Sequence, residues 1–206
     1  MKIAIVDSGI HEGHPHVGRV AGGIGVTEDG FSEDFLDRQG HGTAVAGAIR
    51  EKAANADLYA VKIFDRRLSA GIDTIIRALE WCIGHDMDLI NLSLGTANPA
   101  HRERFEQILT PGVALISVAG MLPGSLDGAI AVAPEDCPRD TFRYRQGVFY
   151  ASPYPRPIPG VPPERNLQGA SFAVANMTGF AAMALASVGR ERLRAELIRR
   201  AEGRSR

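Results

Sequence analysis

The run GASFAVANMTGFAAMALAS, residues 169–187, decides how the rest of the chain can fold. From Phe172 to Ser187 it has no charged residue, and small and apolar side chains would lie on every side of a helix. A helix that is apolar on all faces is buried inside a protein. At about sixteen residues it is too short to span a bilayer, which takes roughly twenty. We therefore predict a core helix with Ser171 in its first turn, where serine is a favoured helix cap.

Size and charge restrict what the chain can be. Its 206 residues suffice for a substantial core, and we expect residues 1–206 to form one domain. The formal net charge is −1, which gives no reason to expect nucleic acid or a membrane as a partner. Arginines gather near the end of the chain, but glutamates alternate with them as on a solvated amphipathic helix. These arginines are Arg190, Arg192, Arg194, Arg199, Arg200, Arg204 and Arg206.

The cysteines and the start of the sequence indicate the compartment. Cys82 and Cys137 form neither a disulfide framework nor a metal-binding spacing, and Cys82 is interpreted as a small buried hydrophobic residue. No signal-peptide pattern precedes the apolar run at residues 2–6. We therefore expect a cytoplasmic protein without an N-terminal pro-segment.

Short apolar runs alternate with helical patterns along the chain. We expect strands at 2–6, 20–26, 58–64, 88–92, 113–119 and 129–133, and helices at 41–54, 70–84, 102–109 and 172–187. This alternation predicts a three-layer α/β fold, with a mostly parallel central sheet and helices on both faces. In such folds functional residues gather at the carboxyl ends of strands, where Asp7, Ser93 and Gly120 fall.

Residues 134–168 differ from the rest because prolines are frequent in them. Proline cannot donate a backbone hydrogen bond, which makes a regular helix or central strand implausible there. We expect a long Pro-rich loop that delivers the chain to Ser171, either as a rigid surface connection or as a flap over the site. The prolines in question are Pro153, Pro155, Pro157, Pro159, Pro162 and Pro163.

Three residues supply the groups that a serine hydrolase needs. Such an enzyme requires a base for the hydroxyl proton and a carboxylate that orients the base. Asp7 in IVDSGI, His41 in QGHGTAVAG and Ser171 in QGASFA each lie in a glycine-flanked turn. Singly, Asp7 could be a turn former and His41 a packed or capping histidine. Their order along the chain is that of subtilisin, whereas nucleophile-elbow hydrolases run Ser, Asp, His.

These motifs resemble those of subtilisin-type serine proteases, the subtilases, over nearly the whole chain. The matching stretches are DSGI at 7–10 with His14-Pro15, HGT at 41–43 with VAG at 45–47, LYAVK at 58–62, INLSLG at 90–95 and GASFA at 169–173. Ala170 and Phe172 replace the family's usual threonine and methionine.

The resemblance implies a role for each residue. Ser171 would be the nucleophile, His41 the general base and then acid, and Asp7 the residue that orients it. The backbone N–H of Ser171, at the positive end of a helix, would help to hold the oxyanion. Substrate would bind along the segment Ser93, Leu94 and Gly95 and beside Ala119 and Gly120.

The chain departs from the family at the second oxyanion donor. Relatives have an asparagine after an Ala-Gly pair, but here Ala119-Gly120 is followed by Met121, whose thioether cannot donate. In subtilisin itself, losing this donor lowers turnover about 100- to 1000-fold. Either another donor replaces it, such as Asn91, Asn98 or a loop N–H, or the enzyme is slow, as suits a protease that cuts one partner a few times.

Two connections are shorter than in the family. Leu122-Pro123-Gly124 leads almost directly to the next strand, so the specificity pocket should be open or rebuilt. The helix from His41 continues to the strand at 58–64 without the calcium-binding loop of many relatives, so we expect no tight calcium site. The histidines of the turn after Asp7 lack acidic or cysteine partners at ligand spacing, so we expect neither a metal nor a cofactor. They are His11, His14 and His16.

The resemblance therefore predicts an intracellular serine endopeptidase that acts through an acyl-enzyme. Its size and departures resemble small subtilisin-like maturation proteases, which remove leader peptides, so the substrate would be a peptide or protein, in the narrower case one dedicated leader-bearing peptide. Two other functions stay open. One is a catalytically impaired homologue that only binds peptides along Ser93–Gly95, and the other is an esterase or amidase for small molecules.

Overall fold

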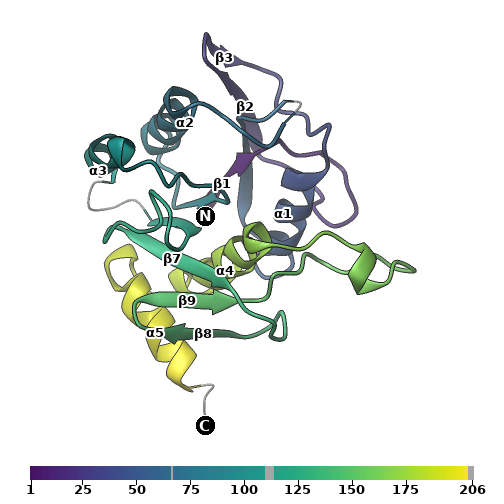
Figure 1. The fold of residues 1–206 in the computed structure, drawn as a ribbon. Helices are drawn as coiled ribbons and strands as arrows, with labels where there is room; N and C mark the ends of the chain where they lie inside the picture. Colours follow the sequence, from purple (N-terminus) through teal and green to yellow (C-terminus); the bar gives the residue numbers. More distant parts are fainter. Residues whose placement is uncertain (66, 110–113, 204–206) are drawn as a thin grey trace.

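The computed structural model describes residues 1–65, 67–109 and 114–203, which Figure 1 draws as a ribbon. Val113, at the start of a predicted strand, and Arg204 and Arg206 of the basic tail lie outside these ranges.

The strands of the described chain join in one sheet of nine, in the order β3-β2-β4-β1-β5-β6-β7-β9-β8. Neighbours from β2 to β9 pair in parallel, while the edge strands β3 and β8 are antiparallel to their partners. The mostly parallel sheet predicted from the sequence is confirmed. The strands are β1 (Lys2–Asp7), β2 (Gly22–Thr27), β3 (Gly30–Ser32), β4 (Asp57–Lys62), β5 (Leu89–Leu92), β6 (Ala114–Val118), β7 (Ala129–Pro134), β8 (Phe142–Arg145) and β9 (Val148–Ala151).

Helices cover both faces of this sheet and complete three layers (Figure 1). The helices are α1 (His41–Arg50), α2 (Ile72–Gly84), α3 (Arg102–Ile108), α4 (Ala170–Leu185) and α5 (Leu193–Gly203), with short 3-10 turns η1 (Pro99–His101), η2 (Pro163–Arg165) and η3 (Arg190–Arg192). One core cluster holds α1, α4 and α5, and the other holds α2 and α3. Within β1, Ile3 and Ile5 belong to the first cluster and Ala4 and Val6 to the second. A strand buried on both faces explains why its sequence is apolar throughout.

The predicted core helix is α4, and the chain packs around it. Twelve of its sixteen residues are buried, and it contacts α1, α5 and the strands β5, β6, β7 and β9. Its polar side chains have partners: the Asn176 amide donates to the carbonyls of Ser152 and Tyr154, and the Thr178 hydroxyl bonds to Asn91 Oδ1 and to Val174 O. Because a buried polar group without a partner costs about 1–3 kcal/mol, these bonds let a polar pair remain inside the core.

The prediction of a continuous loop at 134–168 is wrong for residues 142–151. These residues form the β8–β9 hairpin, and β9 pairs in parallel with β7. The hairpin turns at Gln146 and Gly147, whose φ angles of 49° and 86° suit a two-residue turn that matches strand twist. Residues 139–152 contain no proline, so the backbone argument against strands applied only to the segment that follows. Residues 152–168 contain no strand, and only the turn η2 interrupts them.

Candidate active site

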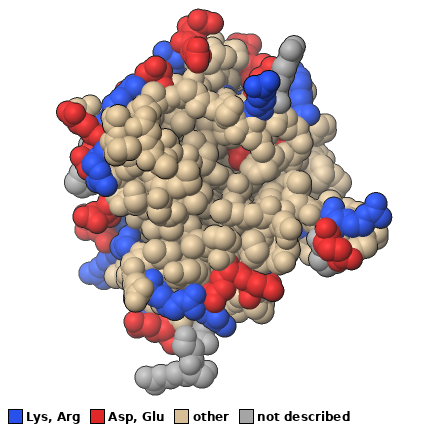
Figure 2. Space-filling view, in the orientation of Figure 1, with Lys and Arg blue, Asp and Glu red and all other residues tan. Residues whose placement is uncertain are grey.

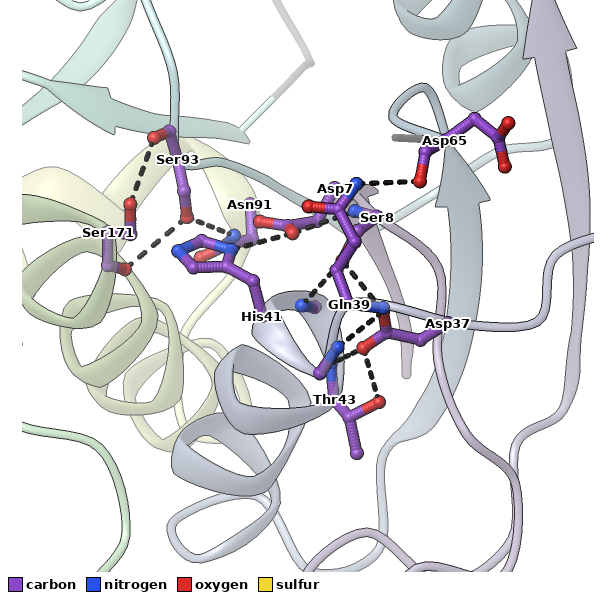
Figure 3. Close-up of polar contacts among 12 residues, drawn as sticks. Asp7, Ser8, Asp37, Gln39, His41, Thr43, Asp65, Asn91, Ser93 and Ser171 are labelled. Atoms are coloured by element: carbon purple, nitrogen blue, oxygen red, sulfur yellow. Dashed lines mark hydrogen bonds and ion pairs between the residues drawn. The ribbon is translucent and has the colours of Figure 1, made fainter. Parts of the chain in front are cut away.

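Four chain segments meet at the carboxyl end of the central strands (Figure 3). Asp7 is the last residue of β1, and Ser93 follows β5, its neighbour in the sheet. His41 is the first residue of α1, and Ser171 is the second residue of α4. Parallel strands end at the same sheet edge, so residues far apart in the sequence lie together here.

Asp7 and His41 are joined by a hydrogen bond. His41 Nδ1 lies 2.7 Å from Asp7 Oδ1, and the backbone N–H of Ser8 donates to the same oxygen at 2.7 Å. Asp7 is only 1% exposed, and its Oδ2 accepts no hydrogen bond from the described residues. A buried carboxylate at this distance fixes the ring and its tautomer, with the proton on Nδ1.

Two carboxylates affect the protonation of His41. Burial alone lowers the pKa of the imidazole, but the hydrogen bond with Asp7 and the charges of Asp7 and Asp37 outweigh it. The net result is a pKa raised above the ordinary value of 6.5. The site therefore stabilises the imidazolium, the form that His41 takes when it accepts a proton.

Ser171 is held against Ser93 in this structure. Ser171 Oγ donates to the carbonyl oxygen of Ser93 at 3.3 Å, and Ser93 Oγ donates to the carbonyl of Ser171, also at 3.3 Å. Figure 3 places the imidazole between Asp7 and Ser171, but no hydrogen bond joins His41 to Ser171. As the second residue of α4, Ser171 has a backbone N–H without an intrahelical acceptor.

Asp37 is a functional candidate that the sequence reasoning missed. This carboxylate is 6% exposed and accepts five hydrogen bonds, from the Ser8 and Thr43 hydroxyls and three backbone N–H groups. Burial alone would raise its pKa, but these bonds lower the pKa below its ordinary value and keep the group charged. Asp37 thus ties the turn after Asp7 to the first turn of α1, where His41 begins.

We predict that Asp37→Asn lowers the pKa of His41, because one of the charges that stabilise the imidazolium is lost. The acid limb of any His41-dependent activity should move to lower pH with it. The free energy of unfolding should fall by about 1–3 kcal/mol, since an amide cannot accept all five bonds. NMR titration of the imidazole measures the pKa without requiring activity, and exposed Asp29→Asn is the matched control. An unchanged titration in Asp37→Asn would contradict the electrostatic role.

Met121, the residue at the departure from the family pattern, lies beside the predicted substrate segment. A Cβ added to Gly95 would meet the Met121 Cβ at 2.7 Å, so the two chain segments are in close contact. Their pairing continues at Thr96 and Leu122, whose backbones exchange two hydrogen bonds of 2.9 Å. Ala119 donates its N–H to Val132 O, and Gly120 turns the chain with a φ of 75°.

The two asparagines suggested as substitute donors are engaged elsewhere. Asn91 is fully buried, donates from Nδ2 to Ser93 Oγ and accepts at Oδ1 from Thr178. Asn98 caps η1 through Ala100 N–H, and its Nδ2 lies 3.2 Å from His101 Nε2. Of the donors considered from the sequence, the N–H of Ser171 and a loop N–H therefore remain.

Across residues 1–65, 67–109 and 114–203, no group of three or more His, Cys, Asp or Glu side chains is placed to hold a metal ion. None of the helices in these ranges has the length and apolar character needed to cross a membrane. The connection from α1 to β4, where the sequence analysis noted a calcium-binding loop in many relatives, consists of residues 51–56.

Known proteins share sequence similarity with much of this chain. Residues 1–133 match the subtilase family, peptidase group S8, a range that includes Asp7, His41 and Ser93 but not Ser171. A thermostable alkaline protease from Halalkalibacterium halodurans is 32% identical over 66% of this chain and 41% of its own length. Subtilisin E of Bacillus subtilis is 34% identical over 58% of this chain and 34% of its own. The chain thus spans well under half of these two relatives.

Two further similarities extend beyond residue 133. Subtilisin DY of Bacillus licheniformis is 26% identical over 90% of this chain and 76% of its own length. The crystal structure of a cold-adapted subtilisin-like serine proteinase superposes with a TM-score of 0.70 at 19% identity, covering 93% of this chain and 78% of that one. The superposition shows a subtilisin-like fold, and the match over 1–133 covers more than half of the sequence. The chain belongs to the subtilase family.

Proposed function

We propose that this chain is a serine endopeptidase in which Ser171 attacks a peptide carbonyl, His41 takes its proton and Asp7 orients His41. The observation that carries the proposal is the buried 2.7 Å bond between Asp7 and His41, with the imidazole lying between that carboxylate and Ser171 (Figure 3). Gly169, with a φ of 146°, caps α4 two residues before Ser171, and the N–H of Ser171 in the first turn has no intrahelical acceptor, so it could donate to a developing oxyanion.

The reaction needs a small movement of Ser171. Its hydroxyl now bonds to the Ser93 carbonyl at 3.3 Å, a long and weak contact. Rotation about the Cα–Cβ bond of Ser171 would turn the hydroxyl toward His41. Catalytic hydrogen bonds in unliganded enzymes are often long and tighten only when substrate binds. His41 then protonates the leaving amine, and water hydrolyses the acyl-enzyme by the same proton transfers in reverse.

We further propose that the enzyme matures one dedicated substrate in the cytoplasm. Met121 in place of a donor would make turnover slow, which suits a protease that makes a single cut. Among maturation proteases, the chain resembles the enzyme that trims the leader of the small subunit of quinohaemoprotein amine dehydrogenase. Cys82 and Cys137 are unpaired thiols, as is usual in a reducing compartment.

Labelling with a fluorophosphonate probe tests the activity. The native protein should be labelled on Ser171, and labelling should vanish in Ser171→Ala and persist in Ser187→Ala, a serine outside the site. Absence of labelling in native protein would favour the peptide-binding homologue instead. Fast ester hydrolysis without cleavage of any peptide would favour the esterase.

The substrate is tested by mass spectrometry. Peptides encoded beside this gene are incubated with the enzyme, and we expect one discrete cut in one leader-bearing peptide. Many cuts in many peptides would contradict the dedicated role but leave the endopeptidase proposal intact.

A further inference from the structure

A hollow of about 500 Å³ lies between the Pro-rich segment and the start of α1. One wall is formed by the first turn of α1 and the turn after β1, through Gly40, Thr43 and His11. The other wall is formed by residues 155–167 of the Pro-rich segment, which Figure 1 shows projecting beyond α1 and α4. Figure 2 shows charged side chains at the tip of this projection, whereas the middle of the same face is largely uncharged.

Two arginines, Arg156 and Arg165, line this hollow. Within residues 1–65, 67–109 and 114–203, neither Arg156 nor Arg165 forms an ion pair, and the Arg156 guanidinium donates only to the His16 carbonyl, at 3.3 Å. Two other charged residues line the hollow. Arg38 pairs with Asp34 at 2.7 Å. Asp37 keeps its negative charge, but it is 6% exposed and accepts five hydrogen bonds, so the two arginines outweigh it.

The rest of the lining adds no further acidic residue among the described parts of the chain. Burial, followed by the nearby charge of Arg156, lowers the pKa of His16, so its ring is neutral near pH 7. Glu164 precedes Arg165 in η2 and is exposed, but it does not line the hollow. Beside the two arginines lie apolar side chains, with Ile158 45% and Leu167 47% exposed. The hollow is therefore suited to a segment with carboxylates next to apolar residues.

The position of the hollow relates it to the reaction. Gly40 adjoins His41 in the chain, and Leu167 is four residues before Ser171. Figure 3 shows Ser93 on one side of the His41 ring and Asp37 and Thr43 on the other. A histidine that protonates the leaving nitrogen must lie beside the part of the peptide that follows the cut bond. If the part of a bound peptide that follows the cut bond passes His41 on the side away from Ser93, it runs toward this hollow.

We propose that the hollow binds acidic side chains that follow the cleaved bond, with Arg156 and Arg165 pairing with their carboxylates. This assignment rests on the proposed endopeptidase function for its place in the reaction. Arginine binds carboxylates through two parallel N–H bonds, and a neutral amide cannot replace that charge-assisted contact. Specificity for an acidic segment would thus be set by residues of the Pro-rich segment and not by the segment around Ser93.

Binding to Ser171→Ala protein tests the site without requiring catalysis. The probes are fluorescein-labelled Ala-Leu-Glu-Glu-Leu-Ala and its counterpart with Gln for each Glu, compared by fluorescence anisotropy. We expect the Glu peptide to bind about tenfold more tightly at low salt, a difference that shrinks as salt screens the charges. The preference should disappear in Arg156→Gln/Arg165→Gln. It should persist in Arg19→Gln/Arg192→Gln, which removes two other exposed arginines without ion pairs in the described chain.

The outcomes separate this proposal from the proposed function. Equal binding of the two peptides, or a preference that survives Arg156→Gln/Arg165→Gln, would overturn the acidic site even if fluorophosphonate labels Ser171. Preference for the Glu peptide in a protein that the probe never labels would support the site and remove its connection with cleavage. In an active enzyme, a peptide library should also show Asp and Glu enriched after the cut, and this enrichment should be lost in the same double variant.

Discussion

Asp7→Asn is expected to slow the reaction of Ser171 with fluorophosphonate about 10⁴- to 3 × 10⁴-fold at neutral pH, the loss of turnover known for the equivalent aspartates of trypsin and subtilisin. The reason is electrostatic. When His41 takes the proton from Ser171, it becomes a cation in a buried setting, and the Asp7 carboxylate is the neighbour that stabilises it. Without that charge, the imidazolium forms at much higher cost.

The orientation of the side-chain amide in the Asp7→Asn protein decides where within this range the loss of labelling rate falls. Asp7 Oδ1 accepts from both Ser8 N–H and His41 Nδ1, while Oδ2 accepts nothing from the described residues. An asparagine that keeps its oxygen at the Oδ1 position holds the tautomer and loses only the charge, but it buries an unsatisfied NH₂. The opposite orientation turns the NH₂ toward Nδ1 and selects the wrong tautomer, which gives the larger loss.

The measurement is the second-order rate constant for labelling, together with the NMR titration of His41. The rate should fall and the pKa of the imidazole should drop below that of the native protein, since the largest pKa-raising contact is removed. Asp29→Asn, an exposed change in the turn between β2 and β3, should alter neither quantity. A labelling rate within tenfold of native in a folded Asp7→Asn protein would show that His41 is not the base.

The helices and strands could be predicted where the local pattern of apolar residues allows only one arrangement. The charge-free run of α4 and the short, mostly apolar runs of β1 and β5 have few alternatives, because a charge-free helix is buried and a short run that is apolar on both sides suits a central strand. The β8–β9 hairpin was missed because the argument against strands, which holds for the prolines at 153–163, was applied to all of residues 134–168. Its turn at Gln146-Gly147, between residues that alternate in burial, was the available signal.

The contacts around the site could not be predicted from such local sequence patterns. Asp37 looks like any acidic turn residue, and its role depends on a hydrogen bond to Ser8, 29 positions away. The hollow is assembled over longer distances still, since Arg156 contacts His16 across 140 positions. Motifs predicted which residues would meet at the sheet edge, but the contacts around them are set by loops whose paths follow from packing and not from local pattern.

Met121→Asn is expected to raise the fluorophosphonate labelling rate about 100-fold, the lower end of the loss known for removing the corresponding asparagine of subtilisin. Two observations favour a gain. The Met121 Cβ lies against Gly95, two residues from the carbonyl that holds Ser171 Oγ. The amides of Asn91 and Asn98 are engaged with other groups. Neither asparagine is therefore free to act beside the N–H of Ser171, and a second donor adds most where only one is present.

Met121→Leu is the control for this prediction, because leucine has a similar volume and no donor. It should leave the labelling rate within about twofold of native, while the free energy of unfolding of both variants is followed by chemical denaturation. A gain in Met121→Asn alone would assign the slow reaction to the missing hydrogen bond. Equal rates in native protein and Met121→Asn would instead require that a backbone N–H, such as one near Gly120, already holds the oxyanion. In that case the departure at Met121 would reshape the pocket beside Gly95 without reducing transition-state stabilisation, and a slow, single-cut enzyme would need another explanation.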